Sequence, residues 1–286
     1  MTTRINKIHF SKSEEDDIIS SYSSNESMCS IGERYNVSNT CIKRLLKELG
    51  VFNTEKRTSK YTLNHNAFEN SPPEEIFYWA GFIAADGCIS VRSDSSKRIV
   101  ITLHTQDVDI LEKFNIFVGT NKPIYFYKDK PQCSVTICST KMVESLAKFN
   151  ITSRKTLMMS VPDIVKGSPH ERHFWRGVID GDGTIGFGKY SPFCGIVGTE
   201  DICTNFTKFC NSLPDFKSKM KICSRKGENL FSSTVLSRNS LIIIEELYRD
   251  CTIYMDRKFK KSADILDTYQ CKIWVKNTIL DGVKKC

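Results

Sequence analysis

One stretch of the sequence occurs twice, and this repeat constrains the fold more than any other feature. Residues 77–87 read FYWAGFIAADG, and residues 173–183 read HFWRGVIDGDG. Both copies have an aromatic pair, a glycine, two apolar residues and a final Asp-Gly. Residues four apart share a face of a helix, so each copy predicts a helix with a groove of small residues. Those small residues are Gly81 and Ala85 in one copy, and Gly177 and Gly181 in the other. Two such helices can pack with their backbones nearly touching.

The end of each copy places a carboxylate at the end of a predicted helix. Gly87 and Gly183 occupy the position where a left-handed helix stop is usual. If the two helices pack together, Asp86 and Asp182 arrive side by side at the negative ends of two helix dipoles. This is unfavourable unless something positive compensates. Paired oxygen ligands with room for water and phosphate suit Mg²⁺. The alternative is a buried helix pair whose Asp-Gly is only a turn.

The composition limits which class of binding partner and which cellular compartment we expect. The 286 residues contain 41 Lys+Arg and 33 Asp+Glu, a net charge of +8, which favours a polyanionic partner over an ordinary basic protein. The 12 cysteines include no Cys-x-x-Cys pair, so we expect reduced thiols rather than disulfides or zinc. This predicts an intracellular, reducing compartment, in a bacterium, a phage-infected cell or an organelle. No apolar run approaches the ~20 residues of a transmembrane helix, and no membrane partner is expected.

Residues 1–52 predict a separate helical unit. One helix begins near residues 13–16 with Ser11 or Ser13 as its cap, a second covers 28–35, and a third covers 38–49 and stops at Gly50. The pattern resembles helix-turn-helix modules, whose second helix meets base edges in the major groove with its early residues. Here those residues are Ser38, Asn39, Thr40, Lys43 and Arg44. The alternative is a helical hairpin that binds protein or nothing.

The rest of the chain divides into a linker and two matching parts. Residues 53–73 read as a polar, basic linker. Residues 74–165 and 166–286 each predict the element order αββαββα, an α+β domain that has been duplicated. The strands are expected near residues 88–92, 99–103, 124–127 and 134–137 in the first part, and near 184–187, 195–197, 219–222 and 231–236 in the second. The later helices are expected at 108–118, 142–147, 202–213 and 241–248.

Alternation along the strands predicts two faces for each antiparallel sheet. The residues expected to point inward are Ile89, Val91, Ile101, Val135, Ile137, Met220 and Ile222. The residues expected to point outward are Arg92, Tyr125, Tyr127, Thr136, Lys219, Lys221 and Arg225. The outward set suits base edges and phosphates of the DNA major groove. Each of them alone is equally consistent with a solvated surface residue.

Over roughly residues 68–270, the chain resembles a LAGLIDADG homing endonuclease of the single-chain, two-motif kind. The family's motif maps onto residues 79–87 and 175–183, and the repeated αββαββα order matches both halves. The resemblance implies two pseudo-symmetric halves whose sheets form a DNA-binding saddle. It also implies a site-specific endonuclease that cuts both strands of a long, asymmetric double-stranded DNA target. The implied cofactor is Mg²⁺ or Mn²⁺, and the implied state is a monomer. The helix-turn-helix lies outside the family's core.

The resemblance also implies roles for individual residues. In the family the last acid of each motif binds the metal, which points to Asp86 and Asp182, with the carbonyls of Ala85 and Gly181 as further ligands. A water-organising residue maps to Thr105 or Gln106 in one half, and to Thr199 or Glu200 in the other. Basic residues beside the scissile phosphates map to Lys155 and Lys258, each preceded by arginine. The family's earlier acid is Asp180 in the second motif but Ala84 in the first, so that position cannot be indispensable chemistry here.

Two other functions use the same fold. A maturase would bind intron RNA, and a degenerate descendant would regulate transcription by binding DNA without cutting. Retention of both terminal acids and both lysines argues against the degenerate version. An intein is disfavoured because the motifs are not bracketed by splicing residues.

Overall fold

A computed structural model describes residues 8–24, 26–52, 61–93, 95–153, 160–216, 219–224 and 230–283, of which 270–283 are described only as helix backbone. The chain divides into two compact units, residues 1–60 and 61–286, and each is described by itself. Two predicted site residues, Lys155 and Arg225, lie outside the described residues, as does the basic part of the predicted linker, residues 53–60.

The first unit has the three predicted helices, α1 (Lys12–Ser23), α2 (Met28–Arg34) and α3 (Asn39–Glu48). Serine caps all three helices, and at α1 the cap is reciprocal: the Glu14 carboxylate accepts the Ser11 N–H at 2.7 Å. The helices enclose a small apolar core that includes Ile18, Ile31 and Ile42. This unit therefore has a hydrophobic core of its own.

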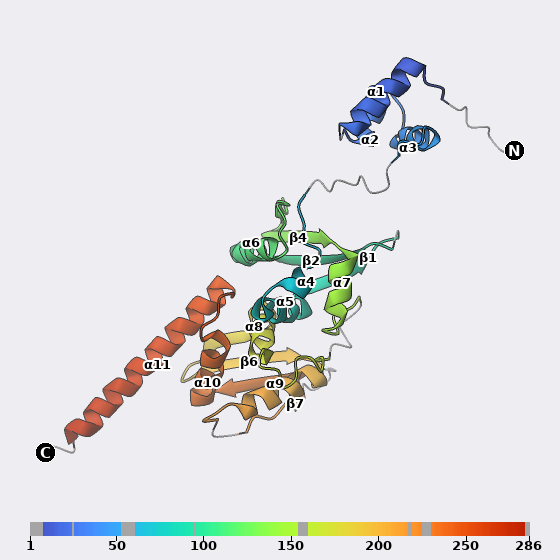
Figure 1. The fold of residues 1–286 in the computed structure, drawn as a ribbon. Helices are drawn as coiled ribbons and strands as arrows, with labels where there is room; N and C mark the ends of the chain where they lie inside the picture. The colour runs from blue at the N-terminus through green and yellow to red at the C-terminus, as the bar shows by residue number, and fades with distance from the viewer. Residues whose placement is uncertain are drawn as a thin grey trace. The chain divides into compact units, whose positions relative to one another are not determined.

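The second unit contains the two predicted halves (Figure 1). The first half consists of α5 (Pro73–Ala85), β1 (Gly87–Val91), β2 (Lys97–His104), a 3₁₀ turn at Thr105–Asp107, α6 (Val108–Phe117), β3 (Tyr125–Phe126), β4 (Gln132–Cys138) and α7 (Thr140–Ala147). The second consists of α8 (Glu171–Gly181), β5 (Thr184–Phe187), β6 (Pro192–Gly198), α9 (Glu200–Ser212), β7 (Cys223–Ser224), β8 (Phe231–Leu236) and α10 (Ser237–Tyr248). Both sheets are antiparallel, with matching strand orders β1-β2-β4-β3 and β5-β6-β8-β7. The predicted α+β duplication is confirmed.

Two predictions, the end of the linker and the position of one strand, differ from the structure, and one helix was not predicted. The boundary of the linker is earlier than residue 73, because a short helix, α4 (Ala67–Asn70), packs Ala67 and Phe68 into the core of the second unit. The strand expected at 219–222 lies at Cys223–Ser224 instead. A long helix, α11 (Asp256–Val283), follows the second half and was not predicted.

The helices of each half cover one face of its sheet, and the other face carries the more exposed side chains. Ile89, Ile101, Val135 and Ile137 are buried on the covered face as predicted. Val91 was predicted to be buried but is 51% exposed, because β1 ends at this residue. In the second half, Met220 is buried and Ile222 packs against the core, although neither lies in a strand. No helix in the described part of the chain is long and apolar enough to cross a membrane.

Candidate functional site

The two motif helices, α5 and α8, pack along their predicted small-residue grooves. A Cβ atom added to Gly81 would lie 2.0 Å from the carbonyl oxygen of Phe174. A Cβ added to Gly177 would lie 2.1 Å from the carbonyl oxygen of Tyr78. Backbone therefore meets backbone at both glycines, and only a residue without a side chain fits there. We call this contact between α5 and α8 the seam.

The two motif acids end the seam helices. Asp86 is the C-cap of α5, and Asp182 is the C-cap of α8. A Cβ added to Gly181 would lie 3.3 Å from Oδ2 of Asp86 and 2.5 Å from the Cβ of Ala85. The carboxylate of Asp86 thus lies against the last residue of α8, directly before Asp182. Asp86 and Asp182 were predicted to lie side by side, and the structure brings the Asp86 carboxylate against the residue before Asp182.

The glycines that follow the two acids have a different role from the one predicted. Gly87 and Gly183 were expected to provide a left-handed helix stop, but neither has a positive φ. A Cβ at Gly87 would lie 2.8 Å from the carbonyl oxygen of Ile83, and one at Gly183 would lie 2.5 Å from the Cα of Ile179. Glycine is required there because the chain turns back closely onto its own helix.

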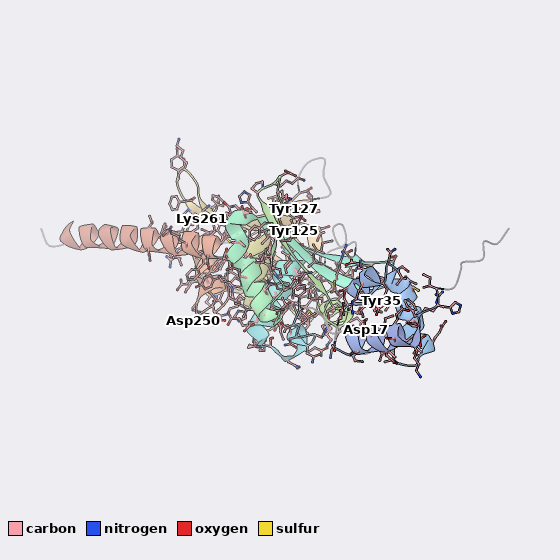
Figure 2. All side chains as sticks on the ribbon, turned by 90° about the horizontal axis from the view of Figure 1, so that it is seen from above. Asp17, Tyr35, Tyr125, Tyr127, Asp250 and Lys261 are labelled. Carbon is pink, nitrogen blue, oxygen red and sulfur yellow. The ribbon has the colours of Figure 1, made fainter. Side chains whose placement is uncertain are left out.

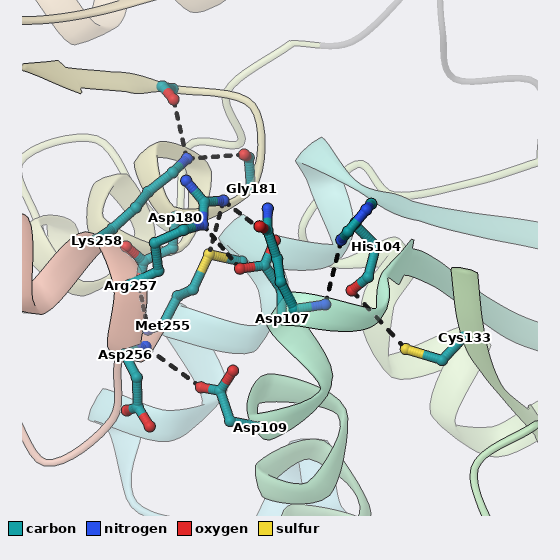
Figure 3. Close-up of polar contacts among 12 residues, drawn as sticks. His104, Asp107, Asp109, Cys133, Asp180, Gly181, Met255, Asp256, Arg257 and Lys258 are labelled. Carbon is teal, nitrogen blue, oxygen red and sulfur yellow. Dashed lines mark hydrogen bonds and ion pairs between the residues drawn. The ribbon is translucent and has the colours of Figure 1, made fainter. Parts of the chain in front are cut away.

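Lys258 supplies positive charge at the end of α8. Its Nζ donates hydrogen bonds to the carbonyl oxygens of Ile179, Gly181 and Gly183, the last two at 2.9 Å (Figure 3). Burial lowers the pKa of Lys258, and the nearby carboxylates, Asp180 foremost and then Asp86 and Asp182, oppose this effect. A cation at this point satisfies helix-end carbonyls and offsets the negative end of the helix dipole. The positive charge that the two acids require is therefore provided in part by the protein.

Asp180 is completely buried and joins three parts of the second unit. Its carboxylate accepts hydrogen bonds from the hydroxyls of Tyr78 (2.8 Å) and Tyr248 (2.5 Å), and from the backbone N–H of Met255 (2.9 Å). Burial raises the pKa of Asp180, while these three donors and the charge of Lys258 lower it. All three hydrogen bonds tie α8 to other elements, which gives Asp180 a structural role that Ala84 cannot share.

Replacing Asp180 by alanine is expected to lower the free energy of unfolding by at least about 3 kcal/mol, because three buried donors lose their acceptor at roughly 1–3 kcal/mol each when no water replaces it. Urea unfolding followed by circular dichroism measures the change. The matched control is Asp163→Ala, which removes a carboxylate whose side chain is 97% exposed and whose ion pair with Lys166 is worth at most about 1 kcal/mol. Equal stability of the two variants would show that the Asp180 network does not hold the fold.

A second contact joins the halves beside Lys258. Arg257 makes two hydrogen bonds to the buried carboxylate of Asp107, Nε to Oδ1 at 2.8 Å and an NH2 group to Oδ2 at 3.1 Å (Figure 3). Lys113 reaches the same region, donating to Asp256 Oδ1 and to the Tyr254 carbonyl oxygen. The first turn of α11 is thereby anchored to the first half, and this anchor fixes the position of Lys258.

A buried cation also links the start of the two seam helices. Arg176 is fully buried and donates to the carbonyl oxygens of Ile253 (2.9 Å) and Leu247 (3.0 Å) and to the Glu74 carboxylate (2.7 Å). The imidazole Nδ1 of His173 lies 3.0 Å from the same guanidinium. Burial, and then the charge of Arg176, lower the pKa of His173 from 6.5 to about 4.

This cluster predicts a loss of stability in mild acid. Below pH 6.5 the unfolded chain protonates His173, whereas the folded chain does so only near pH 4. The unfolded state therefore binds more protons in this window, and stability falls as the pH falls. Between about pH 7 and about pH 5 the loss assigned to His173 is about 2 kcal/mol. Urea unfolding at the two pH values should show this part of the loss disappear in His173→Gln and remain in the control, His104→Gln, which changes an exposed imidazole. An unchanged pH dependence in His173→Gln contradicts the assignment.

The predicted water-organising residues lie directly after β2 and β6. Thr105 begins the 3₁₀ turn, and its N–H donates to the carbonyl oxygen of Pro131 at 3.0 Å. Thr199 is the N-cap of α9, and its hydroxyl accepts the Ile202 N–H at 3.3 Å. Gln106 and Glu200, the alternatives at these positions, are exposed. The catalytic role of either pair stays a prediction.

Of the predicted DNA-contacting side chains, those that the structure describes lie on the surface. Arg92, Tyr125, Tyr127, Lys219 and Lys221 are exposed, and Thr136 is half-buried. Tyr125 and Tyr127 lie next to each other with ring centroids 5.0 Å apart (Figure 2). On α3, the five predicted residues Ser38, Asn39, Thr40, Lys43 and Arg44 are all exposed. Ser38 also caps the helix, and the Nζ of Lys43 lies 5.4 Å from the ring centroid of Phe52.

The donor set at the end of the seam consists only of oxygens. Asp86, Asp182 and the carbonyl of Ala85 are oxygen donors, the ligand type that a hard divalent cation takes while it keeps several waters. The carbonyl of Gly181, the fourth predicted ligand, accepts a hydrogen bond from Lys258. Among the described residues, no group of three or more His, Cys, Asp and Glu side chains is suited to hold a metal. The residues therefore fit a cation held by two carboxylates and water, and do not fit zinc.

Sequence reasoning missed Asp107 and the anchor of α11. The signal available in the sequence was the arginine before Lys258, whose partner the sequence does not indicate. Asp107 lies 150 residues away in the chain, and its carboxylate looks like an ordinary acid at a helix start.

Residues 79–159 match the model of the LAGLIDADG endonuclease family. No curated protein matches the chain significantly. Meganuclease I-SmaMI bound to an uncleaveable DNA with a TTGT central four is 12% identical over 75% of this chain and 95% of that one, with a TM-score of 0.50. The I-LtrWI LAGLIDADG homing endonuclease bound to target DNA is 12% identical over 73% and 92%, with a TM-score of 0.49. The likeness to I-SmaMI extends the shared fold over both halves. The part of the chain that matches the LAGLIDADG endonuclease family is thus the first half, and the second half packs its own motif helix against it at the seam.

Proposed function

We propose that the chain is a site-specific homing endonuclease that hydrolyses phosphodiesters on both strands of double-stranded DNA with the help of divalent cations. One observation carries the proposal: the seam brings the turn of Asp86 against the turn of Asp182, one acid from each half. The match of the first half to an endonuclease family supports the reaction class. A pair of acids related by the pseudo-symmetry of the halves suits a reaction that must occur once on each strand.

Asp86 and Asp182 would hold Mg²⁺ or Mn²⁺, with the Ala85 carbonyl as a further ligand and the Gly181 carbonyl shared with Lys258. When bound, such ions activate water and stabilise the charge that develops on the phosphate and the leaving oxygen. Lys258 would add positive charge at a site that is partly removed from water, where charge is worth more than in bulk solvent. Its three carbonyl contacts hold the ammonium in place before substrate arrives. Lys155 would be its counterpart in the first half, and Thr105 and Thr199, or Gln106 and Glu200, would orient water.

Binding would use the outer faces of the two sheets, with Tyr125 and Thr136, and the segments that adjoin their strands, with Arg92, Tyr127, Lys219, Lys221 and Arg225. These residues would contact bases and phosphates in the major groove. Two different sheets in one chain fit a long, asymmetric target read by a monomer. The exposed face of α3, with Ser38, Asn39, Thr40, Lys43 and Arg44, would add a helix-turn-helix contact to the same DNA. The net charge of +8 favours this partner.

The test is cleavage of a library of random-sequence DNA duplexes by the full chain with Mg²⁺, followed by sequencing of the cut ends. We expect one long, asymmetric sequence to be enriched, with cuts on both strands, and no cuts in EDTA. A regulator enriches a bound sequence without cut ends. A maturase enriches no duplex, and instead binds a structured intron RNA. Either of the last two results contradicts the proposal.

A further inference from the structure

Strand pairing shows which residues lie side by side across the strands on the outer face of the second sheet. Thr184 pairs with Gly195, which pairs with Thr234, and Gly186 pairs with Phe193, which pairs with Leu236. Val197 pairs with Ser232. Paired residues share a face, and the residues between them, Ile185, Cys194, Ile196, Ser233 and Val235, are buried on the covered face. Cys223 of β7 pairs with Ser232 and shares its face. We call the first set, Thr184, Gly186, Phe193, Gly195, Val197, Ser232, Thr234 and Leu236, together with Cys223, the outer face of the second sheet.

This face is apolar where side chains are large. Leu236 is 60% exposed and Val197 is 40% exposed. The ring of Phe193 lies over Gly186, since a Cβ there would be 2.5 Å from its Cζ atom. The remaining members are two threonines, a serine, a cysteine and two glycines, so the described strand residues of this face include no charged or amide side chain. Exposed apolar side chains that lie beside hydroxyl groups on one sheet face indicate a binding surface.

The outer face of the first sheet also includes apolar residues, among them Cys88 paired with Val100, but it adds charged and amide side chains. Its rows include Arg98 beside Ser90, Gln132 beside His104, and Tyr125 beside Ser134. The Arg98 Nε donates to the Ser90 hydroxyl at 3.2 Å, which holds the guanidinium on the sheet. Arginine and glutamine make the bidentate hydrogen bonds that distinguish guanine and adenine. The two halves, although they share a fold, therefore present different chemistry to a ligand.

We propose that the outer face of the second sheet reads thymine 5-methyl groups, so that the half of the target on this sheet is specified by apolar contact rather than by bidentate hydrogen bonds. This rests on the proposed function. Without arginine, lysine, asparagine or glutamine among its described residues, this face lacks the groups that make bidentate contacts with purines. Valine, leucine and phenylalanine contact the thymine methyl group, the one apolar feature of the major groove, and hydroxyls of threonine and serine accept or donate to any base edge.

Charge at the margin of this face fits DNA as the occupant. Lys219 and Lys221 are exposed just before β7, and Lys189 lies in the turn between β5 and β6 with its Nζ 5.0 Å from the ring centroid of Tyr190. An apolar floor with lysines at its margin matches a groove whose methyl groups lie between two phosphate backbones. A second copy of the chain would carry the same lysines at the margin of this face, so these charges do not favour pairing of the two faces.

The experiment uses the duplex enriched by cleavage selection and replaces thymine by uracil, which lacks only the methyl group, in one half of the target at a time. Fluorescence anisotropy in EDTA measures binding of intact duplex by the full chain. We expect uracil in one half to weaken binding about fourfold for each contacted methyl group, the effect of burying one methyl group, and uracil in the other half to have no effect. In Leu236→Asn and Val197→Thr, the thymine preference of the sensitive half should shrink.

The matched control is Ile116→Asn, because Ile116 is 79% exposed on α6 and does not lie on either sheet. This variant should keep the full thymine preference. Equal binding of thymine and uracil in both halves would overturn the proposal while leaving the endonuclease proposal intact. Failure to enrich any duplex would overturn both. If sedimentation shows a dimer that Leu236→Asn converts to a monomer, the face joins two copies and the thymine proposal is wrong.

Discussion

Replacing Gly177 by alanine is expected to lower the free energy of unfolding by more than about 3 kcal/mol, beyond the usual cost of overpacking a core. The added Cβ would lie 2.1 Å from the Tyr78 carbonyl oxygen and 2.7 Å from the Phe82 nitrogen. Both are backbone atoms, so no side chain can rotate away. The seam must open instead, which exposes the aromatic residues packed on α5 and α8 and separates Asp86 from Asp182.

Urea unfolding of the purified variant measures this loss, and Gly81→Ala should behave in the same way, since its Cβ would lie 2.0 Å from the Phe174 carbonyl oxygen. The matched control is Gly188→Ala, where the nearest atom to an added Cβ, the Ser191 carbonyl oxygen, is 3.4 Å away and the turn has room. A Gly177→Ala variant as stable as Gly188→Ala would mean that the two helices do not pack as closely as described.

Replacing either motif acid by asparagine is expected to reduce DNA cleavage more than about 100-fold, since even residues that only support a metal ligand typically account for 10- to 100-fold. The amide keeps the shape of the side chain but lacks the charge that binds a divalent cation. Because Asp86 and Asp182 end their helices at the same end of the seam, loss of one is expected to impair cleavage of both strands. DNA affinity should stay within a few-fold of the original, because recognition is assigned to the sheets.

Cleavage of the selected duplex under single-turnover conditions, with each strand labelled separately, measures this effect. Asp163→Asn, which changes an exposed acid outside both motifs, is the control and should cut normally. An Asp86→Asn chain that cuts both strands at the normal rate would remove Asp86 from the catalytic site. Loss of DNA binding together with cleavage would instead assign the acid a structural role.

The seam could be predicted from the sequence because its cause is local. Glycine and alanine at helical spacing identify a close helix contact, and the final Asp-Gly of each copy identifies where the acids lie. The duplicated element order followed from strand and helix periodicity alone, since each half repeats the same alternation. These features depend on neighbouring residues, and the structure confirms them.

The charges that surround the acids could not be predicted, because their partners are distant in the chain. Lys258 donates to carbonyls 75 to 79 residues away, and Arg257 reaches Asp107 across 150 residues. The sequence pointed to a metal as the compensation for Asp86 and Asp182 and to Lys258 as a phosphate contact, whereas in the structure Lys258 itself supplies part of that compensation. Asp180 likewise looked like a degenerate catalytic position, and its hydrogen bonds to Tyr78 and Tyr248 depend on tertiary packing.

Smaller errors also have physical causes. The glycines after the two acids matched a helix-stop pattern, but steric contact with Ile83 and Ile179, not a left-handed conformation, requires them. The linker was drawn too long because a four-residue helix has too little periodicity to stand out, although Phe68 is buried in the core. The difference between the outer faces of the two sheets emerged only from the strand register.

The most direct test of the central account is incubation of a supercoiled plasmid carrying the selected target with the full chain, in Mg²⁺ and in EDTA, with the ends mapped on both strands. We predict a linear product in Mg²⁺, with one cut on each strand within the target, and an intact plasmid in EDTA. A plasmid that the chain binds at this target but leaves supercoiled in Mg²⁺ would contradict the assignment of Asp86 and Asp182 as the acids of a DNA-cleaving site.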